Sequence, residues 1–196
     1  MQDDKLARAF KAFDAYNSQD PNLETDGGKS IPKEVLYAER MTQRLAAFAP
    51  GAPEHVQLAA RCQHIGRWEI PRSKYPMDRK GYLGWRNELK RHHAGIAEGI
   101  LKTCGYDDTT IELVKFLLLK KQLHVNPETQ LLEDVVCLVF LEHYLEDFAA
   151  RHDPDKVVDI LRKTLKKMSP RAVREAPEVL RSDGMRILLD EAVSGS

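Results

Sequence analysis

Apolar residues recur every three to four positions along most of this 196-residue chain, and no stretch of useful length alternates between apolar and polar residues. The first pattern is typical of helices that pack against a core, whereas the second would indicate strands. One such helix is expected from Pro32 to about Pro50, with an inward stripe of Val35, Leu36, Met41, Leu45 and Phe48. The pattern therefore predicts an all-α fold.

Three capping residues followed directly by proline mark helix starts in the second half of the chain: Asn126-Pro127, Asp153-Pro154 and Ser169-Pro170. A polar cap and a proline at the first helical position are the usual signals for a helix N-terminus. They predict helices of about 127–151, 154–168 and 170–180, followed by one near 184–193. We expect residues 1–196 to form a single-domain helical bundle of about eight helices, in which 169–196 is a C-terminal extension.

The segment 62–72 is the most unusual part of the first half. Leu58, Cys62 and Ile65 continue a helical stripe, but Gly66 leaves the helical region cheaply and Pro71 favours an extended residue before it. We therefore expect a helix to end here, with His64 in its last turn and arginines just beyond. Such a helix end suits a metal or an anion, and it equally suits side chains that satisfy the last helix carbonyls.

The segment 131–141 is apolar or cysteine at every position except Glu133 and Asp134. A helix that is apolar all round lies in the middle of a protein. Adjacent residues differ by about 100° around a helix axis, so the two carboxylates cannot both reach the same solvent edge. At least one of them is expected to be buried, and therefore paired, hydrogen-bonded or bound to a metal.

Ionisable residues lie on several otherwise apolar helices, and four of them are candidate metal ligands: Glu39, His64, His93 and Asp134. Helical proteins build metal sites from one ligand on each of several helices, and imidazoles with carboxylates suit a divalent metal. Each residue also has a structural interpretation. Glu39 can pair with a surface cation, His64 can bond a helix carbonyl, and Asp134 can pair with an arginine. Only one of the adjacent His92 and His93 can point inward.

The segment 67–93 concentrates positive charge between aromatic residues. Its cations are Arg67, Arg72, Lys74, Arg79, Lys80, Arg86, Lys90 and Arg91, and its aromatic residues are Trp68, Tyr75, Tyr82 and Trp85. Arginine forks match phosphate oxygens, and aromatic rings can stack on a base. A small phosphorylated ligand or nucleotide is therefore expected here. The alternative is a solvated helix face whose aromatic residues pack into the core.

Composition limits the alternatives. A net charge of zero and a pI near 7.1 give no global field that would attract nucleic acid or an acidic membrane, so neither is favoured as a partner. Cys62, Cys104 and Cys137 lie in helical or apolar contexts, which we interpret as free buried thiols in a reducing compartment. With no signal-peptide pattern and no apolar run of membrane-spanning length, a cytoplasmic location is expected.

Several strings in this sequence resemble an uncharacterised family, domain of unknown function 4202. They are Tyr37-Ala38-Glu39-Arg40-Met41, Gln63-His64-Ile65, Arg67-Trp68-Glu69-Ile70-Pro71-Arg72, Tyr75-Pro76, Gly81-Tyr82-Leu83, Trp85-Arg86, Leu132-Glu133-Asp134 and Leu138-Val139-Phe140-Leu141-Glu142. The resemblance runs from about residue 10 to residue 168. The family name itself implies no activity.

A more distant resemblance is to the HD superfamily of helical metal-dependent phosphohydrolases. Gln63-His64-Ile65-Gly66-Arg67 resembles that superfamily's His-Asp-Ile-Gly-Lys string. Glu39 stands where its first His would be, and Asp134 where its last Asp would be. Gln63, His64 and Glu39 all depart from the superfamily's residues, which puts the metal itself in doubt, although His92 or His93 can supply a further imidazole.

These observations leave an enzyme and a binding module as hypotheses. The enzyme is a metal-dependent phosphohydrolase in which Glu39, His64, His93 and Asp134 hold Mn, Zn, Fe or Mg and lower the pKa of a bound water. Its expected catalytic residues are Glu69, as general acid or base, and Arg67, with the substrate bound by Arg72, Lys74, Arg79, Trp85 and Arg86.

The binding module is an HD-like helical domain without catalysis, which recognises a nucleotide, an RNA end or a protein partner. On this hypothesis Gln63 and His64 mark a lost metal site, and Asp134 pairs with His64 or Arg67. A third interpretation is a helical adaptor whose basic, aromatic face binds an acidic protein surface.

Overall fold

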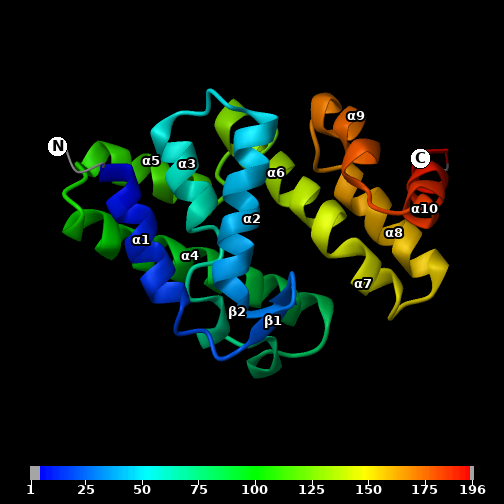
Figure 1. Ribbon diagram of the computed structural model, residues 1–196, viewed down its shortest axis with the longest axis horizontal. Coiled ribbons are helices and arrows are strands. Elements are labelled where there is room, and N and C mark those ends of the chain that lie inside the picture. Colours follow the sequence, from blue (N-terminus) through cyan, green and yellow to red (C-terminus); the bar gives the residue numbers. More distant parts are fainter. Residues whose placement is uncertain (1–4, 195–196) are drawn as a thin grey trace. The chain divides into compact units, whose positions relative to one another are not determined.

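A computed structural model describes residues 5–194, and these residues are almost entirely helical, which confirms the all-α class. Contacts along the chain define two compact units, of which the first ends at Lys121 and the second begins at Gln122. The single domain expected for the whole chain stays a prediction, and each unit is described by itself. The helices labelled in Figure 1 run from α1 to α10, more than the eight or so expected from the sequence.

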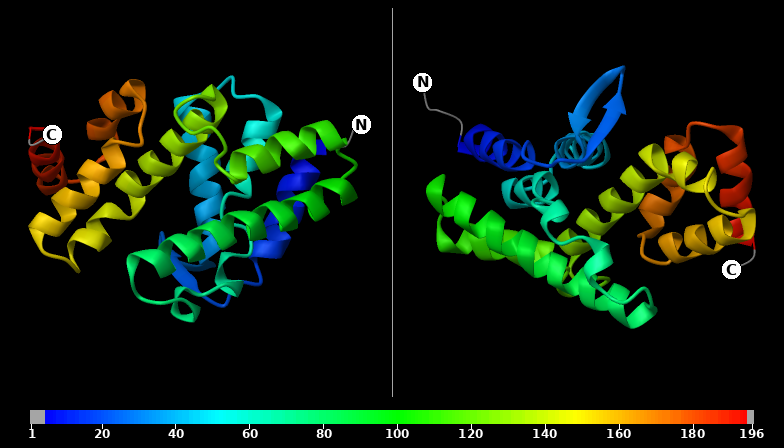
Figure 2. Two further views of the ribbon diagram at one scale, coloured as in Figure 1. Left: turned by 180° about the vertical axis from the view of Figure 1, so that it is seen from behind. Right: turned by 90° about the horizontal axis from the view of Figure 1, so that it is seen from below.

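The first unit contains five α-helices, a β-hairpin and two short 3-10 helices. In chain order these are α1 (Lys5–Asn17), β1 (Leu23–Asp26), β2 (Lys29–Pro32), α2 (Lys33–Phe48), α3 (Glu54–Arg61), η1 (Arg67–Glu69), η2 (Arg72–Lys74), α4 (Arg79–Thr103) and α5 (Asp108–Leu118). Helix α3 lies at the centre of this unit, since it packs against α1, α2 and α5. Helices α4 and α5 lie side by side, as both views in Figure 2 show.

The β-hairpin is a feature that the sequence pattern did not predict, because strands of four residues are too short to show alternation. Its turn is Gly27-Gly28, and both glycines have positive φ angles (53° and 77°). Two such residues are what a tight hairpin turn requires. The hairpin is tied to α2 by Arg40, which makes ion pairs with Glu24 and Asp26.

Helix α4 buries one stripe of side chains along its length, and this stripe includes a histidine. Asp78 caps the helix by accepting a hydrogen bond from the Gly81 backbone N–H at 2.7 Å. Buried side chains then recur every four residues through Trp85, Leu89, His93, Ala97 and Leu101. The stripe therefore places a histidine, His93, in the middle of an otherwise apolar row.

The second unit contains α6 (Pro127–His143), α7 (Leu145–Ala149), α8 (Pro154–Leu165), α9 (Pro170–Val179) and α10 (Asp183–Ser194). The three helix starts predicted from proline are confirmed at Pro127, Pro154 and Pro170. The predicted helix 127–151 breaks at Tyr144 into α6 and α7. Within this unit α8 packs against α10, and α6 packs against α9.

Two further expectations concern the cysteines and membranes. All three cysteines are free thiols, but only Cys62 and Cys137 are buried, and Cys104 is half-buried. Between Lys5 and Ser194, no helix has both the length and the apolar composition needed to cross a bilayer.

Candidate functional site

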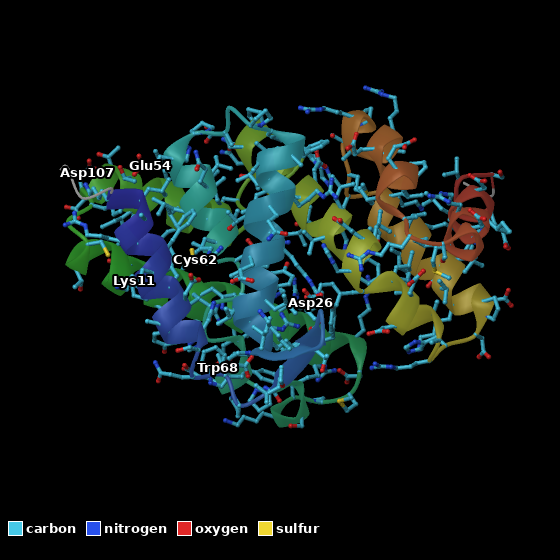
Figure 3. The ribbon with its side chains drawn as sticks, in the orientation of Figure 1. Lys11, Asp26, Glu54, Cys62, Trp68 and Asp107 are labelled. Carbon is cyan, nitrogen blue, oxygen red and sulfur yellow. The ribbon has the colours of Figure 1, made fainter. Side chains whose placement is uncertain are left out.

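The turn that follows α3 is anchored to the elements around it through its backbone. Gly66 has a φ of 68°, which lets the chain turn sharply after Ile65. Its N–H donates to Asn17 Oδ1 (3.3 Å), and its carbonyl accepts from His92 Nε2 (3.2 Å). The Ile65 carbonyl accepts from His93 Nδ1 at 2.6 Å. Figure 3 labels Cys62 and Trp68, between which this turn lies. Helices α1 and α4 thus fix the segment that carries His64 and Arg67.

His64 is half-buried between α2 and Arg67. Its ring stacks on Tyr37 with the ring centroids 4.0 Å apart, and its Nδ1 lies 3.5 Å from Glu34 Oε2. Its Nε2 lies 3.5 Å from Arg67 Nη1. Burial, followed by the nearby charge of Arg67 and then by those of Arg86 and Lys120, holds the pKa of His64 well below 6.5. His64 is therefore a neutral imidazole surrounded by cations.

His93 is the second neutral imidazole. Burial is the main reason that its pKa falls to about 3. Because Nδ1 donates its proton to the Ile65 carbonyl, Nε2 is the ring nitrogen that carries the lone pair. The rings of His64 and His93 lie 5.8 Å apart, so the two imidazoles occupy one site.

Glu34 is the buried carboxyl group of this site. It lies in the first turn of α2, is 4% exposed, and has its pKa raised to about 7, mainly by burial. The Arg67 guanidinium opposes that shift from 3.8 Å, a distance at which it makes no hydrogen bond. Glu34 Oε2 is buried without a hydrogen-bond partner. Near neutral pH this carboxyl group is only partly ionised, and it neutralises the surrounding cations incompletely.

A small pocket opens beside these groups, within the first unit, and its volume of about 10 Å³ gives room for about one water molecule. It is lined by Gln63, His64, Arg86, Leu89, Lys90, His93, Leu118 and Lys120, and we refer to it as the His64 pocket. Gln63 is 4% exposed, and its side-chain oxygen is buried without a hydrogen-bond partner. A buried amide oxygen without a donor is costly unless a ligand or a water molecule donates a hydrogen bond to it. The pocket therefore presents cations, neutral imidazoles and an amide oxygen that can accept a hydrogen bond.

Lys120 reaches this pocket from an uncommon backbone conformation. Its φ is 53°, in the left-handed region, and Gln122 and His124 share that feature with φ angles of 53° and 71°. Each such non-glycine residue costs about 1–3 kcal/mol and persists where surrounding structure enforces it, often at functional sites. The end of α5 thus places Lys120 at the pocket at an energetic cost.

Trp85 supports the arginines of the site. The Arg67 guanidinium lies 4.9 Å and the Arg72 guanidinium 6.0 Å from its ring centre. The indole N–H donates to the Ile70 carbonyl at 2.8 Å. Since Trp85 is only 9% exposed, its ring faces are occupied by protein groups and it orients Arg67.

The remaining candidates of the cationic segment lie outside the pocket lining. Arg72 donates to the carbonyls of Tyr75 (3.0 Å) and Asp78 (3.3 Å) and so stiffens the loop that leads to α4. Lys74 and Arg79 are exposed. Glu69 accepts from the Tyr16 hydroxyl at 2.7 Å and lies 3.2 Å from His92 Nε2, which ties η1 to α1 and α4.

Of the four expected metal ligands, the structure brings His64 and His93 together. Glu39 is half-buried on α2, but Glu34 is the carboxyl group that reaches His64. His93 Nδ1 is engaged with the Ile65 carbonyl. Throughout residues 5–194, no group of three or more His, Cys, Asp or Glu side chains is arranged to hold a metal ion. The divalent metal expected from the sequence stays a prediction.

Asp134 has a structural role within the second unit. Its Oδ1 accepts from the Ser169 N–H (2.8 Å) and from Gln130 Nε2 (2.9 Å), and its Oδ2 accepts from the Ser169 hydroxyl (2.6 Å). Ser169 in turn caps α9 by accepting from the Ala172 N–H. The carboxylate expected to bind metal thus fixes the start of α9 to α6.

We expect Asp134→Asn to destabilise the second unit by about 1–3 kcal/mol, because an amide cannot accept at both positions and leaves a buried donor unpaired. Asp159→Asn is the matched control, since Asp159 is exposed and pairs only with Lys163 in an i, i+4 contact worth a few tenths of a kcal/mol. Hydrogen exchange of α9 amides in the two variants measures the difference. Equal protection in both would contradict this role of Asp134.

The sequence interpretation missed Glu34, and it left Gln63 and Lys120 out of the candidate ligand-binding residues. Glu34 had a detectable signal, because positions 34, 41 and 48 are spaced by seven and both Met41 and Phe48 are buried. Gln63 and Lys120 had no local signal, since their roles depend on how the ends of α3 and α5 meet α4.

Comparison with known proteins gives one match. The chain matches the family described as a domain of unknown function (DUF4202) over residues 7–189. No curated protein and no solved structure matches it. The HD-like resemblance therefore stays a prediction. Because the match covers nearly the whole sequence, the chain belongs to the DUF4202 family.

Proposed function

We propose that the first unit recognises a small phosphorylated ligand through the His64 pocket, and that it acts by binding rather than by metal-dependent hydrolysis. The observation that carries the proposal is the arrangement of cations around a half-buried neutral imidazole, that of His64. Arg67, Arg86 and Lys120 all lie close enough to His64 to lower its pKa. An anion placed among them would relieve their mutual repulsion.

The buried carboxyl group that contacts His64 carries little negative charge in mildly acidic solution. It belongs to Glu34, whose pKa of about 7 leaves it largely protonated there. In the described part of the chain, Arg86 forms no ion pair with any carboxylate. An arginine that lines a pocket without a carboxylate partner favours a bound anion, and guanidinium forks favour phosphate among the common anions.

The metal-dependent phosphohydrolase expected from the HD resemblance has weaker support. Its ligand set would need Glu39 and Asp134, but Asp134 uses both carboxylate oxygens on Ser169. Its catalytic acid or base, Glu69, is engaged with Tyr16 and His92. The binding hypothesis needs none of these residues to change partner.

Calorimetric titration with pyrophosphate, in buffer containing EDTA, tests the proposal. Arg86→Gln is expected to weaken binding about tenfold or more, which corresponds to about 1.5–3 kcal/mol for a charge-assisted hydrogen bond. Arg91→Gln is the matched control, because Arg91 is an exposed arginine on the same helix outside the pocket lining.

Three outcomes would overturn the proposal. The first is equal pyrophosphate affinity in the Arg86 and Arg91 variants. The second is binding that appears only after a divalent metal is added. The third is metal-dependent release of phosphate from nucleotides that His64→Ala abolishes, which would favour the hydrolase instead.

A further inference from the structure

The cationic lining of the His64 pocket continues along α4 beyond the pocket itself. Arg79, Arg86 and Lys90 are separated by seven and four residues, so all three lie on one face of the helix. Arg86 and Lys90 line the pocket, whereas Arg79 is exposed in the first turn. At a rise of 1.5 Å per residue, Arg79 lies about 10 Å along the axis from Arg86. A single phosphate group cannot span that distance.

Exposed apolar side chains accompany this charged face. Tyr82 is 47% exposed, and Leu83, one turn after Arg79, is 51% exposed. Tyr82 also packs beside Trp85, with ring centroids 5.9 Å apart, which restrains its position. A restrained, exposed aromatic ring next to cationic side chains is an element by which proteins stack the bases of single-stranded nucleic acids.

The acidic residues of the same segment do not neutralise this face. The Asp78 carboxylate caps α4 through the Gly81 N–H, and the Glu88 carboxylate accepts from the Tyr75 hydroxyl. The Glu69 carboxylate is held by Tyr16 and His92. Each of these acids therefore has a local structural partner, and Arg79 and Arg86 keep their positive character on this face.

From these observations we infer that the phosphorylated ligand is the end of a single-stranded nucleic acid, with its terminal phosphate at the opening of the His64 pocket and the adjoining nucleotides along the Arg79–Tyr82 face of α4. This inference rests on the proposed function, since it extends the same site. The pocket has a volume of about 10 Å³, room for about one water molecule, so the terminal phosphate would meet Arg86 and Lys90 at its opening. Neutral overall charge agrees with a local contact of this kind and argues against a general nucleic-acid surface.

Fluorescence anisotropy with short single-stranded oligonucleotides tests the inference, alongside the pyrophosphate titration. The phosphorylated strand is expected to bind at least about tenfold tighter than the same strand without a terminal phosphate, and tighter than pyrophosphate. Arg79→Gln is expected to weaken strand binding about fivefold and to reduce the dependence on salt by about one phosphate contact. It should leave pyrophosphate affinity unchanged.

Tyr82 supplies a control for stacking. Tyr82→Ala is expected to weaken strand binding about tenfold, whereas Tyr82→Phe keeps the aromatic ring and should retain strand binding.

If pyrophosphate binds at the pocket but the strand gains no affinity from Arg79 or Tyr82, this inference fails while the proposed function stands. If pyrophosphate itself does not bind, the proposed function fails. A third outcome would contradict the nucleic acid and favour a membrane surface. In that case the protein binds vesicles that contain phosphatidylserine but does not bind the strand, and both Arg79→Gln and Tyr82→Ala abolish the vesicle binding.

Discussion

Replacing Gly66 by alanine is expected to lower the free energy of unfolding by about 3 kcal/mol or more. The Gly66 backbone has a φ of 68°, where a residue with a Cβ atom is strained. The added Cβ would also lie 2.5 Å from Ile96 Cδ1, 3.0 Å from His92 Nε2 and 3.2 Å from Tyr16 Cε1. Relief of these contacts would displace His92, which holds the Gly66 carbonyl, and with it the turn that carries His64 and Arg67.

Gly84→Ala is the matched control for this prediction. Gly84 lies in α4 and is exposed, and a Cβ added there meets nothing within 4 Å. Alanine is favoured over glycine in a helix by about 0.8–1.0 kcal/mol, so the control should be as stable as the wild type or slightly more stable. Chemical denaturation of both variants measures the difference, and pyrophosphate titration of Gly66→Ala follows the effect on the site. Gly66→Ala as stable as Gly84→Ala would contradict the proposed role of the turn.

The second large effect is expected from Glu34→Gln, through the pH dependence of stability. The pKa of Glu34 is about 7 in the folded chain, against an ordinary value of 4.5. Between these two values the folded state keeps the proton and the unfolded state loses it. The carboxyl group therefore makes folding less favourable as pH rises, by up to about 1.4 kcal/mol per pH unit and about 3 kcal/mol in total.

Glutamine does not titrate, so the stability of Glu34→Gln relative to wild type should increase as pH rises from about 5 to 8, by roughly 2–3 kcal/mol. Comparing the two proteins cancels the opposite contribution of His64 and His93, whose lowered pKa values favour the folded state as pH rises. Glu112→Gln, at an exposed position, should show no such trend. A difference between wild type and Glu34→Gln that stays constant with pH would show that Glu34 is ionised throughout.

The fold could be predicted from local signals to a large extent, because helix starts are encoded locally. Asn126-Pro127 and Ser169-Pro170 each supply a cap and a fixed φ angle, and the side chains of Asn126 and Ser169 do cap their helices. The β-hairpin escaped prediction because it depends on two consecutive left-handed residues, Gly27 and Gly28, and not on apolar alternation.

The site could be predicted only in part. The turn at Gly66 and the inward His93 follow from glycine and from helical spacing. The carboxyl group that contacts His64 could not be predicted. Glu34 and Glu39 both lie on α2, and the choice between them depends on how α2 is rotated toward α3. Burial of Leu36, Tyr37, Ala38 and Met41 turns Glu34 inward. The role of Asp134 likewise depends on Ser169, which is 35 positions away and carries no signal that relates the two.

The most direct test of the anion pocket is a crystal structure of the protein with tungstate, a heavy phosphate analogue whose position is given by its anomalous scattering. One strong anomalous peak is expected at the opening of the His64 pocket, with Arg86 and Lys120 donating to the oxyanion beside His64. A peak elsewhere with this pocket empty, or a divalent metal ion bound between His64 and His93, would contradict it.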